Sequence, residues 1–279
     1  MKARHARILL TGATGGIGKA AAAALVKAGA SLLLVGRSVA HLTAQERELS
    51  QGSGAAKPSV ASHATDLTHP SAIKALSEVA ADWGANVVIH GAGLPSFGRL
   101  ESIGDMKQVL DINLLAPMML TQAMLPHLRR LRKAQVLCVG SALGRIGLPG
   151  FSIYCASKFG LRGFSEALRR ELAETSVRVQ YLGPRSTRTT FNDAGVEAHN
   201  RATGTAMDSP DLVAGAILKM LESEAAERFL GFPEKLAVRL NGLVPAFIDP
   251  TLTRHRRHLP EPIGVAVAAP GARSPRSNS

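Results

Sequence analysis

A serine, a tyrosine and a lysine stand close together in the segment GSALGRIGLPGFSIYCASKFG, residues 140–160. Tyr154, one of only two tyrosines in the chain, lies four residues before Lys158 and thirteen after Ser141. Residues four apart are neighbours on a helix, so the phenol and the amine are expected side by side. A free phenol has a pKa of about 10, and a nearby ammonium lowers this pKa because it favours the phenolate. Tyr154 is therefore a candidate general acid or base, and the Ser141 hydroxyl a candidate donor to a substrate oxygen that gains charge.

A second chemical signal, TGATGGIG, lies between a predicted strand and a predicted helix at residues 11–18. Gly12, Gly16 and Gly18 permit a tight turn and let backbone N–H groups approach a pyrophosphate at the positive end of the helix. The spacing is G-x-x-x-G-x-G, not the commoner G-x-G-x-x-G. Glycines at a strand-to-helix turn also have a purely structural use, and a Tyr–Lys pair also occurs on helix surfaces by chance. In combination, the two signals predict a dinucleotide site beside Tyr154, where an oxidised nicotinamide would lower the pKa of the phenol further.

The residue that follows the second predicted strand indicates which dinucleotide is bound. A site for NAD(H) usually carries an acidic residue there, which binds the ribose 2′-hydroxyl. This chain has Gly36 and then Arg37. A guanidinium can pair with a 2′-phosphate through charge-assisted hydrogen bonds, so NADP(H) is favoured over NAD(H). The alternative is that Arg37 is a solvated loop residue.

Apolar runs alternate with helix-forming stretches along most of the chain. The candidate strands are residues 8–10, 31–36, a weak one around Val60 that leads to Asp66, 86–93, 135–142 and 177–184. The candidate helices are residues 19–29, 39–49, 71–81, 106–109, 114–131 and 154–173, and one that begins near Pro210. This alternation predicts a parallel sheet covered on both faces. The predicted fold class is α/β: a Rossmann-type, doubly wound parallel sheet with helices on both faces, in a single domain.

Composition divides the chain further and excludes several classes of protein. Residues 1–230 are expected to form the dinucleotide-binding and catalytic domain, with a polar loop after Pro184, and residues 231–259 a helical or lid-like extension of it. Residues 260–279 are rich in Pro, Ser and Arg and are expected to be disordered. With 46% hydrophobic residues, the chain can build a sizeable core, yet it has no uninterrupted run of about 18 apolar residues. We therefore expect neither a signal peptide nor a spanning helix.

Cysteine usage and charge point away from metal and nucleic-acid sites. Cys138 and Cys155 have neither zinc-site spacing nor the pattern of a disulfide framework, so no metal is expected and a cytoplasmic location fits. The net charge is +12, but the basic residues gather near the chain ends and in RRLRK, residues 129–133, which closes a predicted helix. Aromatic residues make up 4% of the chain and do not interleave with the basic runs. Binding to nucleic acid is therefore not expected.

In combination, these motifs resemble the short-chain dehydrogenase/reductase family, in its compact single-domain branch, over residues 7–230. TGATGGIG fits the cofactor motif of the family, YCASK fits its active-site motif, and DINLLAP contains Asn113, which matches an asparagine that positions a water in a proton relay. The resemblance implies a catalytic tetrad of Asn113, Ser141, Tyr154 and Lys158, with Lys158 also on the nicotinamide ribose. It implies these cofactor-binding residues: Gly12, Thr14, Gly15, Gly16, Ile17, Gly18, Arg37, Asp66, Leu67, His90, Gly91, Ala92, Gly93, Tyr154, Lys158, Pro184, Thr187 and Thr189.

The resemblance also implies an activity and an assembly. The activity is that of an NADP(H)-dependent oxidoreductase, a ketoreductase, which interconverts a carbonyl compound and a secondary alcohol, with reduction as the expected direction. The alternative is a regulator or scaffold that binds a dinucleotide without turnover, but such a protein has no chemical need for Tyr154 and Lys158 together. The assembly implied is a homodimer or homotetramer, paired through residues 114–131 and 154–173. The apolar run LLAPMMLTQAML in the first of these helices could equally belong to the core.

Two departures from the family pattern affect the site. The family's NNAG is replaced by His90-Gly91-Ala92-Gly93, and we expect His90 to be a strand-end residue bonded to backbone, not a catalytic base. After Pro184 the usual glycine is Arg185, for which contact with an anionic group of the substrate is one hypothesis.

The substrate itself is not named by any motif. Phe191, the segment that follows it to Ser209, and residues 96–99 are expected to line or cover the pocket. Residues 229–248 mix apolar and basic side chains, which suits contact with a membrane surface or a lid over a hydrophobic, lipid-like substrate. Packing of this stretch on the core or on a second subunit is the alternative.

Overall fold

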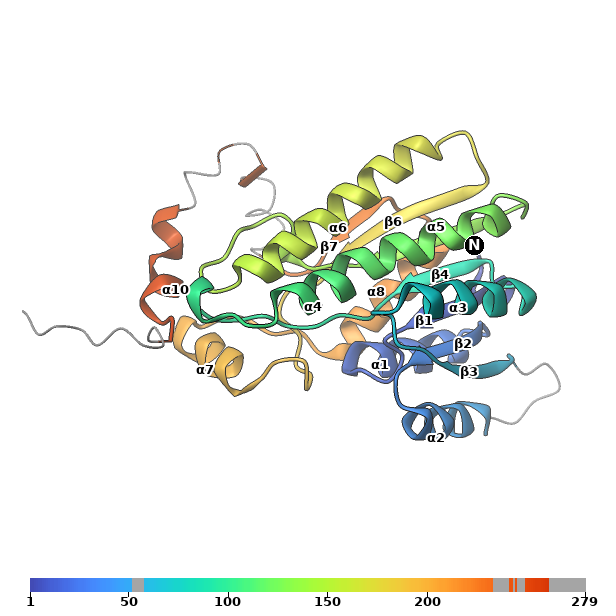
Figure 1. Ribbon diagram of the computed structural model, residues 1–279, viewed down its shortest axis with the longest axis horizontal. Helices are drawn as coiled ribbons and strands as arrows, with labels where there is room; N and C mark the ends of the chain where they lie inside the picture. Colours follow the sequence, from blue (N-terminus) through green and yellow to red (C-terminus); the bar gives the residue numbers. More distant parts are fainter. Residues whose placement is uncertain (52–57, 233–240, 243, 245–248, 261–279) are drawn as a thin grey trace, which may run out of the picture.

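The computed structural model describes residues 1–51, 58–232, 241–242, 244 and 249–260. Seven strands form one sheet in the order β3-β2-β1-β4-β5-β6-β7, and each neighbouring pair is parallel (Figure 1). The strands are β1 (Arg7–Thr11), β2 (Ser31–Gly36), β3 (Val60–Ala64), β4 (Val87–His90), β5 (Ala134–Val139), β6 (Val177–Gly183) and β7 (Glu227–Phe229). The predicted doubly wound Rossmann-type sheet is confirmed. The direction of winding reverses between β1 and β4, and a ligand cleft opens at the carboxyl ends of strands at such a reversal.

Helices cover both faces of the sheet (Figure 1). One face carries α1 (Gly16–Lys27), α2 (Val39–Ser50) and α8 (Pro210–Ser223), and the other carries α3 (Pro70–Asp82), α5 (Ala116–Leu128) and α6 (Ser152–Glu171). Within β1, Ile8 and Leu10 enter the core of the first face, whereas Leu9 enters that of the second. Burying one such side chain stabilises the fold by about 1.5–3 kcal/mol, so a two-sided core fixes the strand register firmly.

Shorter elements connect these layers. They are η1 (Ala3–His5), η2 (Leu100–Ser102), α4 (Met106–Leu110), η3 (Asp111–Leu115), η4 (Ala142–Gly144), α7 (Ala194–Thr203), η6 (Asp249–Leu252) and α10 (Thr253–Arg257). Two of the connections differ from the sequence prediction. The polar segment after Pro184 contains α7, which begins where the Asp193 carboxylate accepts from Val196 N at 2.8 Å and ends at Gly204 with φ +69°. The three-residue strand β7 was not predicted, because so short a run carries no periodicity.

The predicted C-terminal extension is described only in part. Residues 233–240, 243 and 245–248, and so most of the proposed membrane or lid stretch, lie outside the described residues. The described portion includes α10, whose Arg254 guanidinium donates to the Ala202 carbonyl of α7 at 2.8 and 3.1 Å. Of the tail predicted to be disordered, residues 261–279 also lie outside the described part of the chain.

Among the described residues, one continuous helix, Met106–Leu128, is long and apolar enough by composition to span a membrane, whereas the sequence predicted none. An 18-residue stretch of this helix has a mean hydropathy of 1.3, and 39% of that stretch is buried in the protein. The buried positions include Leu120, Met124 and Leu128, which lie in the core of the second face. Part of its apolar character therefore belongs to the core of the sheet.

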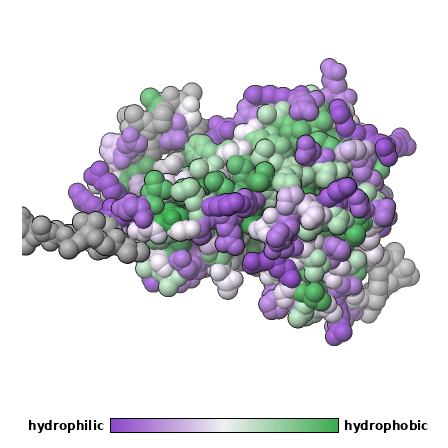
Figure 2. Space-filling model, viewed as in Figure 1, coloured by the Kyte–Doolittle hydropathy of each residue, from purple (hydrophilic) through white to green (hydrophobic). Residues whose placement is uncertain are grey.

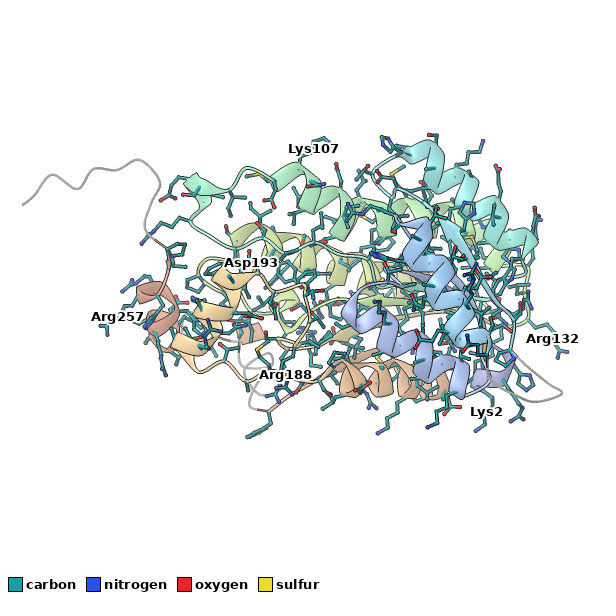
Figure 3. The ribbon with its side chains drawn as sticks, turned by 90° about the horizontal axis from the view of Figure 1, so that it is seen from below. Lys2, Lys107, Arg132, Arg188, Asp193 and Arg257 are labelled. Carbon is teal, nitrogen blue, oxygen red and sulfur yellow. The ribbon has the colours of Figure 1, made fainter. Side chains whose placement is uncertain are left out.

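An exposed apolar surface lies on this helix and on the neighbouring α6. Met106, Leu115 and Phe159 are 40%, 47% and 44% exposed and come from α4, η3 and α6. Figure 2 shows hydrophobic side chains gathered over this part of the molecule. The basic residues are distributed differently: Lys2, Arg132, Arg188 and Arg257 point outward at widely separated places (Figure 3). The four basic residues therefore do not form one patch.

Candidate active site

Helix α6 places the phenol of Tyr154 beside the amine of Lys158. The Lys158 Nζ lies 5.6 Å from the centroid of the Tyr154 ring, and so faces the ring. It also donates to the Val139 carbonyl at the end of β5, at 3.4 Å. The spacing of four residues therefore brings the two side chains together as predicted, and the last residue of β5 holds the amine against the helix.

The predicted lowering of the Tyr154 pKa is not found in the protein alone. Burial of the hydroxyl raises the pKa of Tyr154 to about 12, although a side-chain hydrogen bond with Ser141 acts to lower it. The Lys158 amine faces the ring and does not reverse this shift. At neutral pH the phenol consequently carries its proton, which is the form of a general acid.

Burial acts on Lys158 in the opposite sense. It lowers the pKa of this amine to about 8, because the buried ammonium is poorly solvated. Lys158 is only 4% exposed. Its charge state consequently changes within a range close to neutrality.

Ser141 follows β5 in an extended conformation, with φ −162° and ψ 159°. Its Oγ accepts from Leu143 N at 3.1 Å, so the hydroxyl proton points elsewhere and remains available for donation. The Ser141 side chain lies close enough to Tyr154 to lower the pKa of its phenol. The two hydroxyls predicted to act on one substrate oxygen thus adjoin each other.

Asn113 joins this group from η3, a turn of π-helix within the helix Met106–Leu128. Such π-turns are frequent at functional sites. The Asn113 side chain is fully buried, accepts from Leu94 N at 2.7 Å and donates to the Ser157 hydroxyl at 3.1 Å. Ser157 in turn donates to the Tyr154 carbonyl at 2.7 Å. Ser157, which the sequence reasoning overlooked, thus links Asn113 to the helix that carries the phenol.

Gly93 lies where these side chains meet. A Cβ at this residue would lie 3.3 Å from Asn113 Oδ1 and 3.7 Å from Lys158 Nζ. The four residues of the predicted tetrad therefore adjoin one another at the carboxyl ends of β4 and β5.

The glycine turn lies at the carboxyl end of the adjacent strand β1. Gly12 has φ +69°, and a Cβ there would lie 2.6 Å from the Gly91 carbonyl oxygen. A Cβ on Gly18 would overlap the Gly12 carbonyl oxygen. Both glycines therefore permit main-chain segments to approach closely. Gly15 is the N-cap of α1 and is exposed, so the positive end of this helix faces solvent at the turn.

Thr11 ties this turn to the loop after β4 and was not among the predicted site residues. Its hydroxyl accepts from Gly91 N at 3.1 Å and from Ala92 N at 3.3 Å. The sequence did contain a signal for Thr11, because it is the first residue of the motif TGATGGIG. The predicted residues Thr14 and Ile17 are partly buried within the same turn.

The predicted recognition of the adenosine end involves Arg37 and Asp66. Arg37 is exposed at the end of β2. The pKa of the Asp66 carboxyl is lowered chiefly by hydrogen bonds from the backbone and hydroxyl of Thr68, with a smaller contribution from Arg37. Arg37 and Asp66 therefore lie close enough to interact, while the next residue, Leu67, packs partly into the core.

His90 ends β4 as predicted, but its partner differs. The ring Nε2 contacts the Thr121 hydroxyl at 2.8 Å, and not a backbone group. Burial lowers the pKa of His90 to about 3, so the ring is neutral at physiological pH. This side chain anchors β4 to α5.

The loop after β6 closes over the glycine turn. The Pro184 carbonyl accepts from Ala142 N at 2.7 Å, and a Cβ on Gly16 would overlap the side chain of Thr189. Thr187 is buried, and its hydroxyl donates to the Arg185 carbonyl at 3.0 Å. Of the three predicted positions of this loop, Pro184 thus lies against η4 and Thr189 against α1, whereas Thr187 bonds within the loop.

Arg185 has a different partner from the predicted anionic substrate group. Its Nε and a terminal nitrogen lie 2.9 and 2.7 Å from Oδ1 of Asp208, which is 4% exposed. The ion pair joins the start of the loop to its end before α8. The structure therefore favours a role for Arg185 in holding this loop.

Aromatic side chains form the wall beside Tyr154. Phe191 lies edge-on to Tyr154, with ring centroids 6.1 Å apart. Phe97 and Phe151 pack together at 4.8 Å, and both contact the ring of His199 from α7. The predicted pocket segments around residues 96–99 and after Phe191 thus adjoin the phenol, and what they offer is mainly apolar. Within the described residues, no group of three His, Cys, Asp or Glu side chains is arranged to hold a metal ion.

Comparison with known proteins gives consistent matches. A sequence model described as short chain dehydrogenase matches residues 6–200. "Dehydrogenase/reductase SDR family member 7B" of Bos taurus is 34% identical over 260 residues, covering 87% of this chain and 78% of the bovine protein. The solved structure "Short-chain dehydrogenase from Sphingobium yanoikuyae in complex with NADPH" has a TM-score of 0.73 and 25% identity, covering 88% of this chain and 95% of that chain. A metagenomic short-chain oxidoreductase solved in complex with NADP has a TM-score of 0.66 and 30% identity. The match covers 80% of this chain and 96% of that chain.

Proposed function

Because this chain belongs to the short-chain dehydrogenase/reductase family, we propose that it reduces a carbonyl compound to a secondary alcohol with NADPH and catalyses the reverse oxidation with NADP⁺. The observation that carries this proposal is the placement of Tyr154 between Ser141, whose hydroxyl acts on the pKa of the phenol, and Lys158, whose amine faces the phenol ring. Two adjacent hydroxyls, one of them a protonated phenol, suit a substrate oxygen that gains charge and then a proton.

The chain's own residues handle the oxygen and the proton. Ser141 donates a hydrogen bond to the substrate carbonyl oxygen, and Tyr154 Oη transfers its proton to that oxygen as the carbonyl carbon is reduced. When bound, NADPH supplies the hydride from nicotinamide C4 to that carbon. The Lys158 ammonium stabilises the phenolate that remains on Tyr154, and Asn113 holds the end of the proton path by which Tyr154 is reprotonated.

The described residues fit a nicotinamide dinucleotide. The glycine turn brings β1, the loop after β4 and the positive end of α1 together, which suits a pyrophosphate. Arg37 is exposed beside Asp66 and suits a 2′-phosphate. The Sphingobium and metagenomic relatives were solved with NADPH and NADP, which supports the same preference here.

The apolar wall of Phe97, Phe151 and Phe191 favours a hydrophobic carbonyl substrate.

The exposed apolar surface of Met106, Leu115 and Phe159 supports the association of copies of the chain into a dimer or a tetramer. Light scattering of the purified protein measures its mass. Replacement of Phe159 and Leu115 by Glu is expected to yield the 29.3 kDa monomer.

The decisive experiment is a panel of ketones, aldehydes and acyl-derived carbonyl compounds, followed by NADPH absorbance. Wild-type protein is expected to reduce at least one apolar ketone, and Tyr154→Phe is expected to lose about 10³-fold or more of that rate, because it lacks the transferable proton. Equal rates for the two proteins would show that the proton donor has been misassigned.

Cofactor choice is tested by binding. Arg37→Asp should weaken NADPH at least about 10-fold through loss of charge-assisted hydrogen bonds, while NADH affinity stays the same or improves. Fluorescence titration measures both affinities. Unchanged NADPH affinity would contradict the assignment of Arg37.

A further inference from the structure

The second tyrosine of the chain, Tyr181, fills a slot directly beneath Ser141. Tyr181 lies in β6 and is 2% exposed. A Cβ on Gly140 would overlap its ring, and a Cβ on Gly144 would overlap its hydroxyl oxygen. The loop that carries Ser141 thus has glycines at the two positions where a side chain would exclude the phenol.

The Tyr181 hydroxyl bonds to both backbone polar groups of Ser141. It donates to the Ser141 carbonyl at 2.9 Å and accepts from Ser141 N at 3.0 Å. Burial raises the pKa of Tyr181, so its hydroxyl keeps the proton that this double role requires. Leu143 N orients the Ser141 side chain from the other direction, at 3.1 Å. Backbone and side chain of Ser141 are therefore held by different partners.

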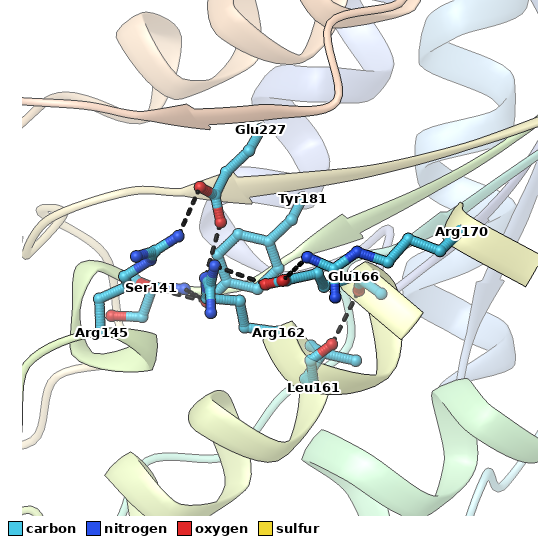
Figure 4. A network of polar contacts seen from close by, with 9 residues as sticks. Ser141, Arg145, Leu161, Arg162, Glu166, Arg170, Tyr181 and Glu227 are labelled. Atoms are coloured by element: carbon cyan, nitrogen blue, oxygen red, sulfur yellow. Dashed lines mark hydrogen bonds and ion pairs between the residues drawn. The ribbon is translucent and has the colours of Figure 1, made fainter. Parts of the chain in front are cut away.

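The edge strand β7 holds Tyr181 in turn. Tyr181 N donates to the Ala226 carbonyl at 2.9 Å, and the Phe229 ring lies 5.9 Å from the tyrosine ring. Glu227 contacts Arg145, four residues after Ser141, at 3.1 Å and Arg162 of α6 at 2.7 Å. Figure 4 shows these ion pairs around the tyrosine, with Ser141 next to it. The Ser141 loop is thereby fixed to β6, β7 and α6 at once.

We infer that Tyr181 is a positioning residue for the reaction: its hydroxyl fixes the backbone of Ser141, so that the Ser141 hydroxyl meets the Tyr154 hydroxyl and the substrate oxygen. This inference rests on the proposed function. Tyr181 touches neither substrate nor cofactor in this account, and acts only through Ser141. Removal of its hydroxyl therefore weakens catalysis without weakening cofactor binding.

The test compares Tyr181→Phe with Ser165→Ala, using the best carbonyl substrate of the panel. Ser165 is also buried and donates to the Leu161 carbonyl at 2.7 Å, so it controls for the loss of any buried hydroxyl. Tyr181→Phe should lower kcat about 10-fold or more, with KM and NADPH affinity within about 2-fold of wild type. Ser165→Ala should leave kcat unchanged.

A double-mutant cycle separates positioning from a general structural defect. If Tyr181 acts through Ser141, then Ser141→Ala and Ser141→Ala/Tyr181→Phe have the same kcat. A further fall in the double variant, as large as that caused by Tyr181→Phe alone, would overturn the inference. So would a kcat for Tyr181→Phe within about 2-fold of wild type.

Hydrogen exchange at the Ser141 amide provides a readout without turnover. Tyr181→Phe should increase exchange in the peptide that contains Ser141, and Ser165→Ala should not. Unchanged exchange would overturn the inference even where wild-type protein reduces no compound of the panel, an outcome that by itself counts only against the proposed function. Should Tyr181→Phe fail to fold, Gly140→Ala, whose new Cβ would meet only side-chain atoms of Tyr181, is expected to give the same signature.

Discussion

The glycine turn after β1 and the Ser141 loop after β5 both omit side chains, but for opposite purposes. At Gly12, the space that a Cβ would take belongs to main-chain atoms of Gly91 and Ala92. At Gly140, the nearest atoms to a Cβ all belong to the side chain of Tyr181. The first region brings backbone segments close together, whereas the second makes room for a phenol. A glycine that accommodates a side chain can be exchanged together with that side chain, and a glycine that accommodates backbone cannot.

The largest effect is expected at the turn. Gly12→Ala combines a positive φ with overlap of fixed backbone, so it should lower the free energy of unfolding by about 3 kcal/mol or more. Gly15→Ala is the matched control, since Gly15 has φ −77° and its nearest neighbour would lie 3.4 Å from the new Cβ. The control should cost less than about 1 kcal/mol in urea denaturation. Similar losses in the two variants would remove the distinction between these glycines.

Lys158 joins the two regions, since its carbonyl lies beside Gly144 and its amine beside Gly93. Between its folded pKa of about 8 and the ordinary value of 10.5, the unfolded chain binds more protons, so stability rises with pH in that range. The burial penalty is complete below pH 8. Lys158→Met should therefore raise the free energy of unfolding by about 2–3 kcal/mol at pH 7, while turnover is lost.

The gain from Lys158→Met should shrink between pH 8 and pH 10.5 and vanish above this range. Lys107→Met, at an exposed position, should stay within about 0.5 kcal/mol of wild type at each pH. Denaturant titrations of the protein without cofactor at several pH values provide the measurement. A gain that does not depend on pH would contradict a charge penalty at Lys158.

Combined substitution of Gly140 and Tyr181 tests the comparison at the Ser141 loop. Gly140→Ala alone should cost about 2 kcal/mol of stability, because the new Cβ overlaps the Tyr181 ring. In a Tyr181→Ala background, the same substitution should cost less than about 0.5 kcal/mol, since the overlapping atoms are gone. Thermal denaturation of the four proteins completes the cycle. Equal costs in both backgrounds would mean that backbone, and not the phenol, requires the glycine.

The smallest effect is expected at the surface ion pairs. Glu227→Gln weakens the contacts to Arg145 and Arg162, which are 29% and 18% exposed at their side chains. The expected loss of stability is about 0.5–1 kcal/mol, less at high salt. Chemical denaturation at low and high salt measures it. A loss as large as that from Gly140→Ala would mean that the ion pairs, more than the phenol, hold the loop.

The features that could be predicted from the sequence are those that depend on a local pattern of residues. Six strands, the glycine turn and the side-by-side placement of Tyr154 and Lys158 follow from periodicity and spacing. The contact between Tyr181 and Ser141 joins residues 40 apart in the chain, so no local sequence pattern predicts it. The same holds for the Arg185–Asp208 ion pair. The lowered pKa of Tyr154 was predicted for the protein with an oxidised cofactor bound; in the protein alone burial raises this pKa, because spacing reveals a neighbouring amine but not the depth of burial.

Transfer of deuterium tests the central claim, reduction by a protonated Tyr154 beside Ser141, most directly. NADPH that carries deuterium at nicotinamide C4 is incubated with an accepted ketone, and the alcohol is analysed by mass spectrometry. Wild-type protein should give an alcohol with one deuterium on the reduced carbon, and Tyr154→Phe should give almost none in the same time. An unlabelled alcohol from wild-type protein, or equal labelling by the two proteins, would contradict the account.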